Sequence, residues 1–266
     1  MQNRLISLII LLAITVSSCS KVPITNRRQV NLLPEVAVSS LSLTSYNDFL
    51  SQNKVVTSGK DAQMVKKVGT KISEAVTAYL RSKKQLKRVK KFNWEFNLVD
   101  DKAENAWAMS GGKVVFYTGI LPITKTETGM AVVMGHEVAH AIARHGNERI
   151  SQGLAAQLGG VGLAVAMRDK PQQTQDIITQ AYGMGSNLGI LKFSRKHESE
   201  ADKMGLVFMA MAGYNPKEAV NFWQRMKAKT EGANPPEFLS THPSHETRIQ
   251  ELHQFMPVAL KYYTKK

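Results

Sequence analysis

Residues 132–146 read VVMGHEVAHAIARHG, and they restrict the possible folds of this chain more than any other stretch. Two histidines, His136 and His140, stand four residues apart among apolar neighbours, a pattern typical of a buried helix. Residues four apart on a helix project from nearly the same face, so both imidazoles can reach one zinc ion. Glu137 then points beside that ion, where its carboxylate can take a proton from an attacking water.

An H-E-x-x-H match alone arises by chance in about one chain in a hundred of this composition. A catalytic zinc ion also needs a third protein ligand besides the two histidines. A histidine six residues after His140 is one option, but Gly146 occupies that position. A carboxylate from a later predicted helix is the other option, and Glu198 and Asp202 share one helical face there. We therefore expect Glu198 to be the ligand and Asp202 to orient the site. The alternative is an exposed charged helix whose lysines pair with these carboxylates.

The N-terminus has the features of an export signal. Arg4 precedes an apolar run over residues 5–16, which is shorter than the roughly 20 apolar residues needed to span a bilayer. The following V-S-S-C resembles a bacterial lipobox, which implies cleavage after residue 18 and acylation of Cys19. The chain has one cysteine, so that residue has no partner for an internal disulfide. The alternative is an ordinary signal peptide with an incidental cysteine.

Ser20 resembles the sorting residue of outer-membrane lipoproteins in Gram-negative bacteria. We therefore expect a lipoprotein that faces the periplasm and is held on the outer membrane through lipidated Cys19. Residues 19–60 are expected to form a tether followed by irregular or helical pieces, and residues 61–266 to form the main domain.

Periodicity predicts an α+β fold, mostly helical with one small sheet. Alternation predicts strands over residues 92–100, 105–109 and 113–121, the last two joined by a tight turn. Helical spacing of apolar residues predicts seven helices. One begins at residue 61, and a second runs from about residue 126 through the histidine motif. The other five cover residues 148–167, 172–185, 193–212, 216–229 and 244–255.

The net charge is +14, and the densest basic run is RSKKQLKRVKK over residues 81–91. Charge excess describes partners and solubility rather than fold. The run can be a solvated face, or it can meet an acidic surface such as lipid headgroups, and the sequence leaves its function open. Nucleic acid is not expected as a partner, because the run lacks interleaved aromatic residues and the chain carries an export signal.

The order of four motifs resembles metallopeptidase family forty-eight, the gluzincin family that includes HtpX, the CAAX prenyl proteases, BepA and LoiP. HEVAH followed by E-S-E-A-D resembles its HExxH…ExxxD pattern. Residues 105–121 resemble its strand pair ahead of the zinc helix, and residues 240–249 its T-H-P segment. The likeness covers roughly residues 62–255, and the chain looks like a short lipoprotein member without a tetratricopeptide region.

This resemblance implies a zinc metalloendopeptidase with one Zn²⁺ per chain, acting on misfolded or unassembled envelope proteins. A non-proteolytic chaperone or assembly factor for outer-membrane proteins is the alternative. The implied zinc ligands are His136, His140 and Glu198, with Glu137 as general base. The implied substrate-binding strand, which would pair with an extended polypeptide, consists of Asn105, Ala106, Trp107, Ala108 and Met109.

Two further residues, His242 and Arg248, resemble family residues that lie near the zinc. His242 is expected to approach the ion and hold the site latent. Both residues are candidates to stabilise the negative charge that develops during the reaction. The alternative for His242 is a loop histidine that caps the next helix. His197 is expected to be exposed, and His145 has no evident role.

Overall fold

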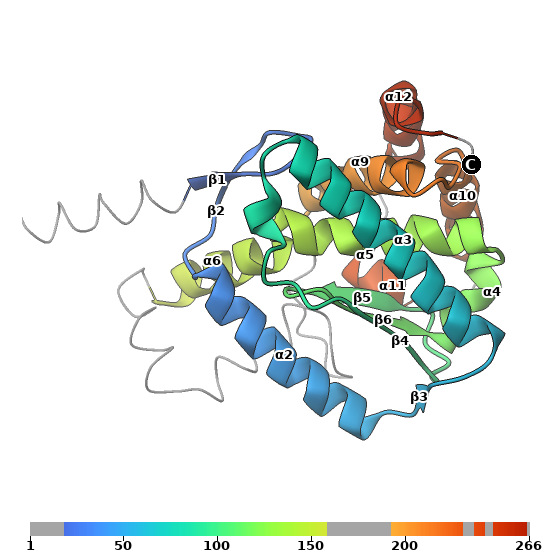
Figure 1. The fold of residues 1–266 in the computed structure, drawn as a ribbon, viewed down its shortest axis with the longest axis horizontal. Coiled ribbons are helices and arrows are strands. Elements are labelled where there is room, and N and C mark those ends of the chain that lie inside the picture. The colour runs from blue at the N-terminus through green and yellow to red at the C-terminus, as the bar shows by residue number, and fades with distance from the viewer. Residues whose placement is uncertain (1–18, 159–192, 231–236, 243–246, 265–266) are drawn as a thin grey trace, which may run out of the picture.

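The structure is a computed structural model that describes residues 19–158, 193–230, 237–242 and 247–264 (Figure 1). The predicted export signal, the predicted helix 172–185 and the end of the predicted helix 148–167 lie outside these residues. Among the described residues, no helix combines the length and the apolar character needed to cross a membrane.

The predicted α+β class is confirmed. The long helices are α2 (Glu35–Gln52), α3 (Lys60–Ser82), α5 (Glu127–Ala143), α6 (His145–Leu158), α9 (Arg195–Met211), α10 (Glu218–Thr230) and α12 (Arg248–Leu260). Short helices are α4 (Leu121–Thr124), α11 (Phe238–Thr241), η1 (Leu86–Arg88) and η2 (Thr118–Ile120).

The main sheet has four strands in the order β3 (Val55–Val56), β4 (Glu95–Val99), β6 (Lys113–Tyr117) and β5 (Ala106–Met109). β4 and β6 are parallel, and the other pairs are antiparallel. The predicted turn between β5 and β6 is present, with Gly111 and Gly112 at φ 88° and 86°, values that glycine adopts without strain. β5 therefore forms one edge of this sheet.

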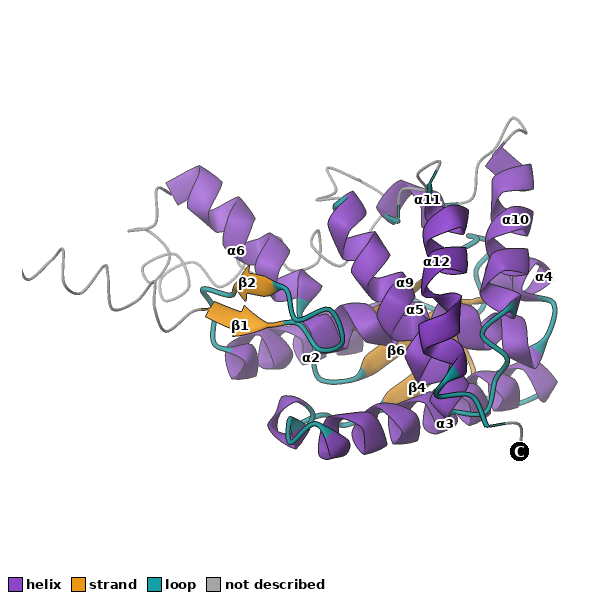
Figure 2. Ribbon diagram, turned by 90° about the horizontal axis from the view of Figure 1, so that it is seen from above, coloured by secondary structure: helices purple, strands orange, loops and turns teal. Residues whose placement is uncertain are grey.

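A second sheet was not expected from the sequence. β1 (Cys19–Lys21) and β2 (Arg28–Val30) pair antiparallel and lie beside α6 (Figure 2). The expected tether therefore begins with a folded hairpin, and it continues into the 18-residue helix α2. Val22 of the hairpin is buried in the main core.

The sheet separates two apolar cores. α2 covers one face, while α3 and α5 lie across the other (Figure 1). Side chains alternate along a strand: Ala106 and Ala108 of β5 belong to the core under α5, and Trp107 and Met109 belong to the core under α2. Trp107 packs edge-on against Tyr46 of α2.

α5 is buried on nearly all sides, as expected for a helix without a continuous polar face. Thr126 caps its start: the Thr126 hydroxyl accepts a hydrogen bond from the Gly129 amide at 3.0 Å. The helix crosses α9 where Gly135 faces Gly205: a Cβ added at Gly135 would lie 3.0 Å from the Gly205 carbonyl oxygen. This close approach brings side chains of α5 and α9 into contact.

Candidate metal centre

Four buried side chains converge at the crossing of α5 and α9. His136 and His140 come from α5, Glu198 from the first turn of α9, and His242 from the residue that ends α11. The Nε2 atoms of His136 and His140 are 3.0 Å apart, and each lies 3.4 Å from a Glu198 oxygen. Tetrahedral bonds of zinc length would place two donors roughly 3.3 Å apart, so these atoms fit one metal ion.

His242 completes this group of donors. Its Nδ1 atom lies 3.1 Å from Oε1 of Glu198 and 3.3 Å from Nε2 of His136. Its other nitrogen, Nε2, is 3.4 Å from Oε1 of Glu137. His242 therefore stands between the metal position and the candidate base, at the position that an incoming water or substrate oxygen would need.

Asp202 lies where the sequence placed it, behind His136. Its Oδ1 atom is 2.9 Å from Nδ1 of His136. A proton on that nitrogen leaves Nε2 free to bind a metal. Burial alone would lower the pKa of His136, but the charges of Glu198 and Asp202 outweigh burial and raise it to about 9. This attraction for a proton is equally an attraction for a metal cation.

Arg248 holds the two carboxylates from outside the donor group. It donates to Glu198 at 3.1 Å and to Asp202 at 2.7 Å, and its guanidinium stacks 3.3 Å from the centre of the Trp223 ring. Arg248 is 1% exposed, so its positive charge interacts with these buried neighbours rather than with solvent. This placement favours a positioning role over contact with a reacting group.

Glu137 is buried beside the edge strand. Burial raises the pKa of its carboxyl, partly opposed by His242 and His136. The Ala108 backbone of β5 hydrogen-bonds the same carboxylate. A carboxyl whose pKa is raised from its ordinary value is a stronger base when ionised, which suits proton transfer near neutral pH.

The edge strand itself is covered in this structure. All five residues of the expected substrate-binding strand are buried. Beside its start, the Phe238 amide donates to the Glu104 carbonyl at 3.0 Å, and Asn105 donates to Glu237 at 3.2 Å. α11 thus lies against the beginning of β5, and it positions His242 at the metal donors.

A second buried cluster lies behind His140, and no role was predicted for its members. Nδ1 of His145 lies 2.9 Å from Nδ1 of His140, and Nε2 of His145 lies 3.2 Å from Glu200. His197 lies 3.1 Å from Glu148 and stacks on His145. The expectation that His197 is exposed is wrong: it is 3% exposed, because α9 packs this residue against α6.

Arg27, from the β1–β2 turn, closes the second cluster. Its guanidinium contacts Glu200 at 2.6 Å and both oxygens of Glu148 at 2.7 Å. The adjacency of His145 to the H-E-x-x-H motif signalled this cluster in the sequence, but the cluster joins three segments that are far apart along the chain.

Comparison with known proteins agrees with the geometry. The model of peptidase family M48 matches residues 66–256. The chain is 39% identical to mitochondrial metalloendopeptidase OMA1 of Schizosaccharomyces pombe over 62% of this chain and 48% of that protein. It is 30% identical to the human mitochondrial metalloendopeptidase OMA1 over 90% of this chain and 46% of that protein.

A bacterial relative is more distant: the beta-barrel assembly-enhancing protease of Escherichia coli is 28% identical over 59% of this chain and 33% of its own length. The matched regions span about half the length of the OMA1 relatives. The chain belongs to peptidase family M48, which confirms the resemblance carried by its four motifs.

Proposed function

We propose that this chain is a zinc-dependent metalloendopeptidase. The observation that carries the proposal is the convergence of His136, His140 and Glu198 on one point, with Glu137 beside it. Two imidazoles and a carboxylate form a donor set that suits zinc, and the outer nitrogens of the two histidines contact Asp202 and His145, as metal-bound histidines require. Bound zinc would polarise the scissile carbonyl and lower the pKa of water.

The chain's own groups supply the proton transfers. Ionised Glu137 takes the proton of the attacking water and later returns it to the leaving amine. The hydrogen bond from the Ala108 backbone fixes this carboxylate beside the edge strand, so the base faces any polypeptide that pairs with β5. Arg248 and Asp202 hold Glu198 and His136 in place.

Substrate entry requires α11 to move away from β5. An extended polypeptide added to a sheet edge gains main-chain hydrogen bonds with little sequence preference. Ala106 and Ala108 are small and face the metal side, whereas Trp107 and Met109 are buried under α2. We infer that the arrangement described here is the latent one, with His242 as a fourth metal donor.

The test of the activity is Glu137→Gln assayed on an unfolded protein, with metal content measured in the same preparations. We expect zinc to remain bound and cleavage to fall by about a hundredfold or more, since an amide cannot accept the proton. Glu74→Gln, an exposed residue of α3, is the matched control and should cleave normally. Cleavage at the unaltered rate by Glu137→Gln would refute the mechanism.

A second experiment tests the third ligand. Glu198→Ala should lose most of its zinc when it is purified beside the unaltered chain. Equal zinc in the two preparations would remove Glu198 from the ligand set.

We further propose that the protein is a lipoprotein of a bacterial envelope, acting on misfolded or unassembled polypeptides there. The lipobox-like V-S-S-C at Cys19 supports the location, as does the likeness to a bacterial protease whose name refers to beta-barrel assembly. Mass spectrometry of the N-terminal peptide should find acyl chains on Cys19 and none in Cys19→Ser. A free thiol on Cys19 in envelope preparations would refute the anchor.

The chaperone alternative makes a different prediction. An assembly factor that does not cleave would rescue a deletion strain equally well with Glu137→Gln and with the unaltered chain. We expect Glu137→Gln to fail in that strain.

A further inference from the structure

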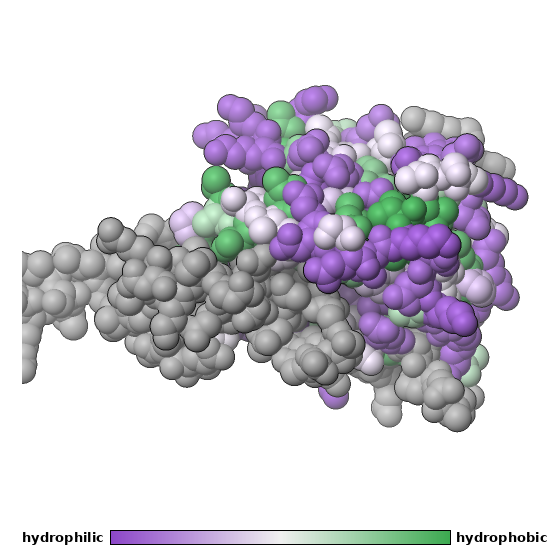
Figure 3. Space-filling model, turned by 90° about the horizontal axis from the view of Figure 1, so that it is seen from below, coloured by the Kyte–Doolittle hydropathy of each residue, from purple (hydrophilic) through white to green (hydrophobic). Residues whose placement is uncertain are grey.

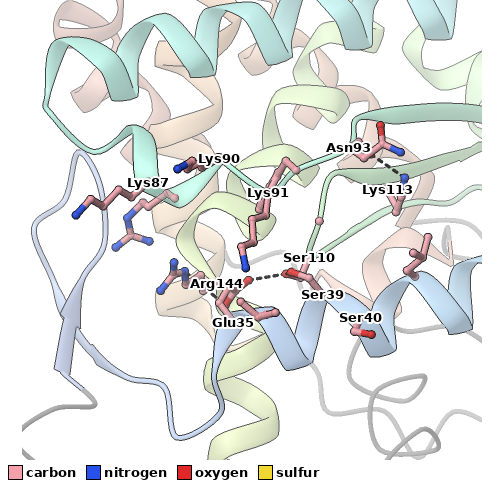
Figure 4. Close-up of a pocket in the computed structure, with 15 residues that line it drawn as sticks. Glu35, Ser39, Ser40, Lys87, Lys90, Lys91, Asn93, Ser110, Lys113 and Arg144 are labelled. Atoms are coloured by element: carbon pink, nitrogen blue, oxygen red, sulfur yellow. Dashed lines mark hydrogen bonds and ion pairs between the residues drawn. The ribbon is translucent and has the colours of Figure 1, made fainter.

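A cavity lined by described residues lies away from the metal centre. It has a volume of about 550 Å³ and opens between the start of α2, the basic run after α3 and the β5–β6 turn (Figure 4). None of the metal donors lines it. We call it the basic pocket, and its cationic lining residues are Lys87, Arg88, Lys90, Lys91, Lys113 and Arg144.

Positive charge in the basic pocket is not balanced by its own residues. Glu35 is the single acidic residue of the lining, and it is already engaged by Ser110 at 2.5 Å and by Arg144 at 3.4 Å. Lys87, Lys90 and Lys91 are exposed and form no ion pair with any residue that the structure describes. Figure 4 shows the Lys91 side chain extending toward Glu35 and Ser110. The charge of this pocket therefore fits an anion.

The floor of the basic pocket brings two guanidinium groups together. Arg88 is partly buried and donates to the Ile142 carbonyl at 3.0 Å and to the Lys21 carbonyl. Burial, and then the charge of Arg144, lower the pKa of Arg88 to about 10. Both effects disfavour the charged form of Arg88, and a bound anion would offset them.

The other side of the pocket is apolar. Val36 and Leu43 stand seven residues apart on α2, so they share one helical face, and they are 56% and 43% exposed. Phe92 lines the pocket opposite them. The surface on the α2 side carries apolar side chains among hydrophilic ones (Figure 3). Exposed apolar residues beside unpaired lysines match a ligand with an anionic head and a hydrocarbon tail.

We propose that the basic pocket binds an anionic phospholipid, with its phosphate on Lys87, Lys90 and Lys91 and its acyl chains against Val36 and Leu43. Clusters of lysine and arginine at a membrane surface attract anionic lipids in this way. Lys21, which accepts the Arg88 hydrogen bond, lies two residues from Cys19, so the pocket adjoins the proposed anchor. The proposal explains the basic run without invoking peptidase activity.

The test measures binding of three soluble probes to the full chain by calorimetry, below the micelle-forming concentration. They are dihexanoyl-phosphatidylglycerol, dihexanoyl-phosphatidylcholine and sn-glycerol 3-phosphate. The anionic lipid should bind roughly tenfold or more tightly than either other probe. Comparable binding of phosphatidylcholine would overturn the role of charge, and comparable binding of glycerol phosphate would identify a site for free phosphate instead.

Matched variants locate the site. Lys87→Gln/Lys90→Gln/Lys91→Gln should bind the anionic lipid roughly tenfold to a hundredfold more weakly. The control with the same charge change alters three exposed lysines elsewhere, Lys66, Lys196 and Lys217, and should bind like the unaltered chain.

Val36→Ser/Leu43→Ser should also bind weakly, since it removes the contact with the acyl chains. All variants change exposed residues, so their melting temperatures should agree. Equal loss of binding in the two lysine triples would overturn the proposal, and so would unchanged binding in the α2 double variant.

Discussion

The Nδ1 atoms of His140 and His145 lie 2.9 Å apart, so one ring must donate and the other accept. Burial lowers the pKa of His145 to about 4, which keeps this ring neutral. Its Nε2 atom faces a Glu200 oxygen and carries the proton, so its Nδ1 atom is the acceptor. His140 then holds its own proton on Nδ1 and presents a bare Nε2 to the metal. His145 therefore fixes which atom of His140 can bind zinc.

His145→Phe should weaken zinc binding by roughly tenfold to a hundredfold, because the ring shape is kept while the acceptor is lost. His145→Asn keeps a side-chain acceptor and should recover part of the affinity. Competition with a chromogenic chelator gives both constants. Thermal unfolding of the metal-free proteins shows whether the fold is retained. Zinc affinity equal to that of the unaltered chain in His145→Phe would show that His140 is oriented without this contact.

Much of the fold follows from local sequence. Helix α3 has buried apolar residues at regular helical spacing, and the turn between β5 and β6 has two glycines at positions that need positive φ. The pairing of Glu198 with the α5 histidines was also predictable, because helical spacing leaves Glu198 and Asp202 on one face.

The second cluster could not be predicted, because its contacts join distant segments. Arg27 and Glu200 are 173 residues apart in sequence, and no periodic pattern links them. His197 stands beside a metal donor on an otherwise charged helix, so its burial depends on α6 packing over it. The packing of residues 19–60 onto the domain also depends on contacts with distant segments. Arg248 is buried for a similar reason, since its partners lie on α9.

Gly205→Ala should destabilise the protein and weaken its metal site together. The new Cβ would lie 3.0 Å from the His136 amide nitrogen and from the Gly135 carbonyl carbon, and neither backbone atom can move alone. We expect a loss of about 1–3 kcal/mol in the free energy of unfolding, although alanine favours helix over glycine. Lys203→Ala, on the same helix, is the control for propensity. Denaturant unfolding measures the free energy of unfolding of both variants. A Gly205→Ala protein more stable than the unaltered chain would contradict the tight helix crossing.

His242→Ala should cleave unfolded substrates faster than the unaltered chain, because it frees the fourth metal position and releases Glu137. A severalfold rise in kcat, with zinc bound somewhat more weakly, is expected from the loss of one donor. Initial rates at saturating substrate measure the first effect, and chelator competition the second. His253→Ala, at an exposed position of α12, is the matched control. Lower kcat with zinc retained would instead make His242 part of the reaction.

Arg27 links the N-terminal hairpin to the second cluster, and its contribution should depend on pH. Burial alone would raise the pKa values of Glu148 and Glu200, but hydrogen bonds from Arg27 and the neighbouring histidines hold both near 2, below the ordinary 4.5. Their stabilisation is therefore complete above pH 4.5 and is lost as the pH falls toward 2. The depressed pKa of His145 also favours unfolding as the pH falls from 6.5 to about 4.

Arg27→Gln should lower the free energy of unfolding at pH 7 by about 2–4 kcal/mol, because it leaves two carboxylates without their cation. The difference from the unaltered chain should shrink below pH 4.5, since protonated carboxyls no longer need that cation. Urea unfolding of the metal-free proteins at pH 7, 5 and 3 measures this difference without a contribution from metal loss. Arg28→Gln, an exposed neighbour with the same charge change, should match the unaltered chain at every pH. A difference that stays constant from pH 7 to pH 3 would mean that Arg27 stabilises the hairpin by packing rather than by its charge.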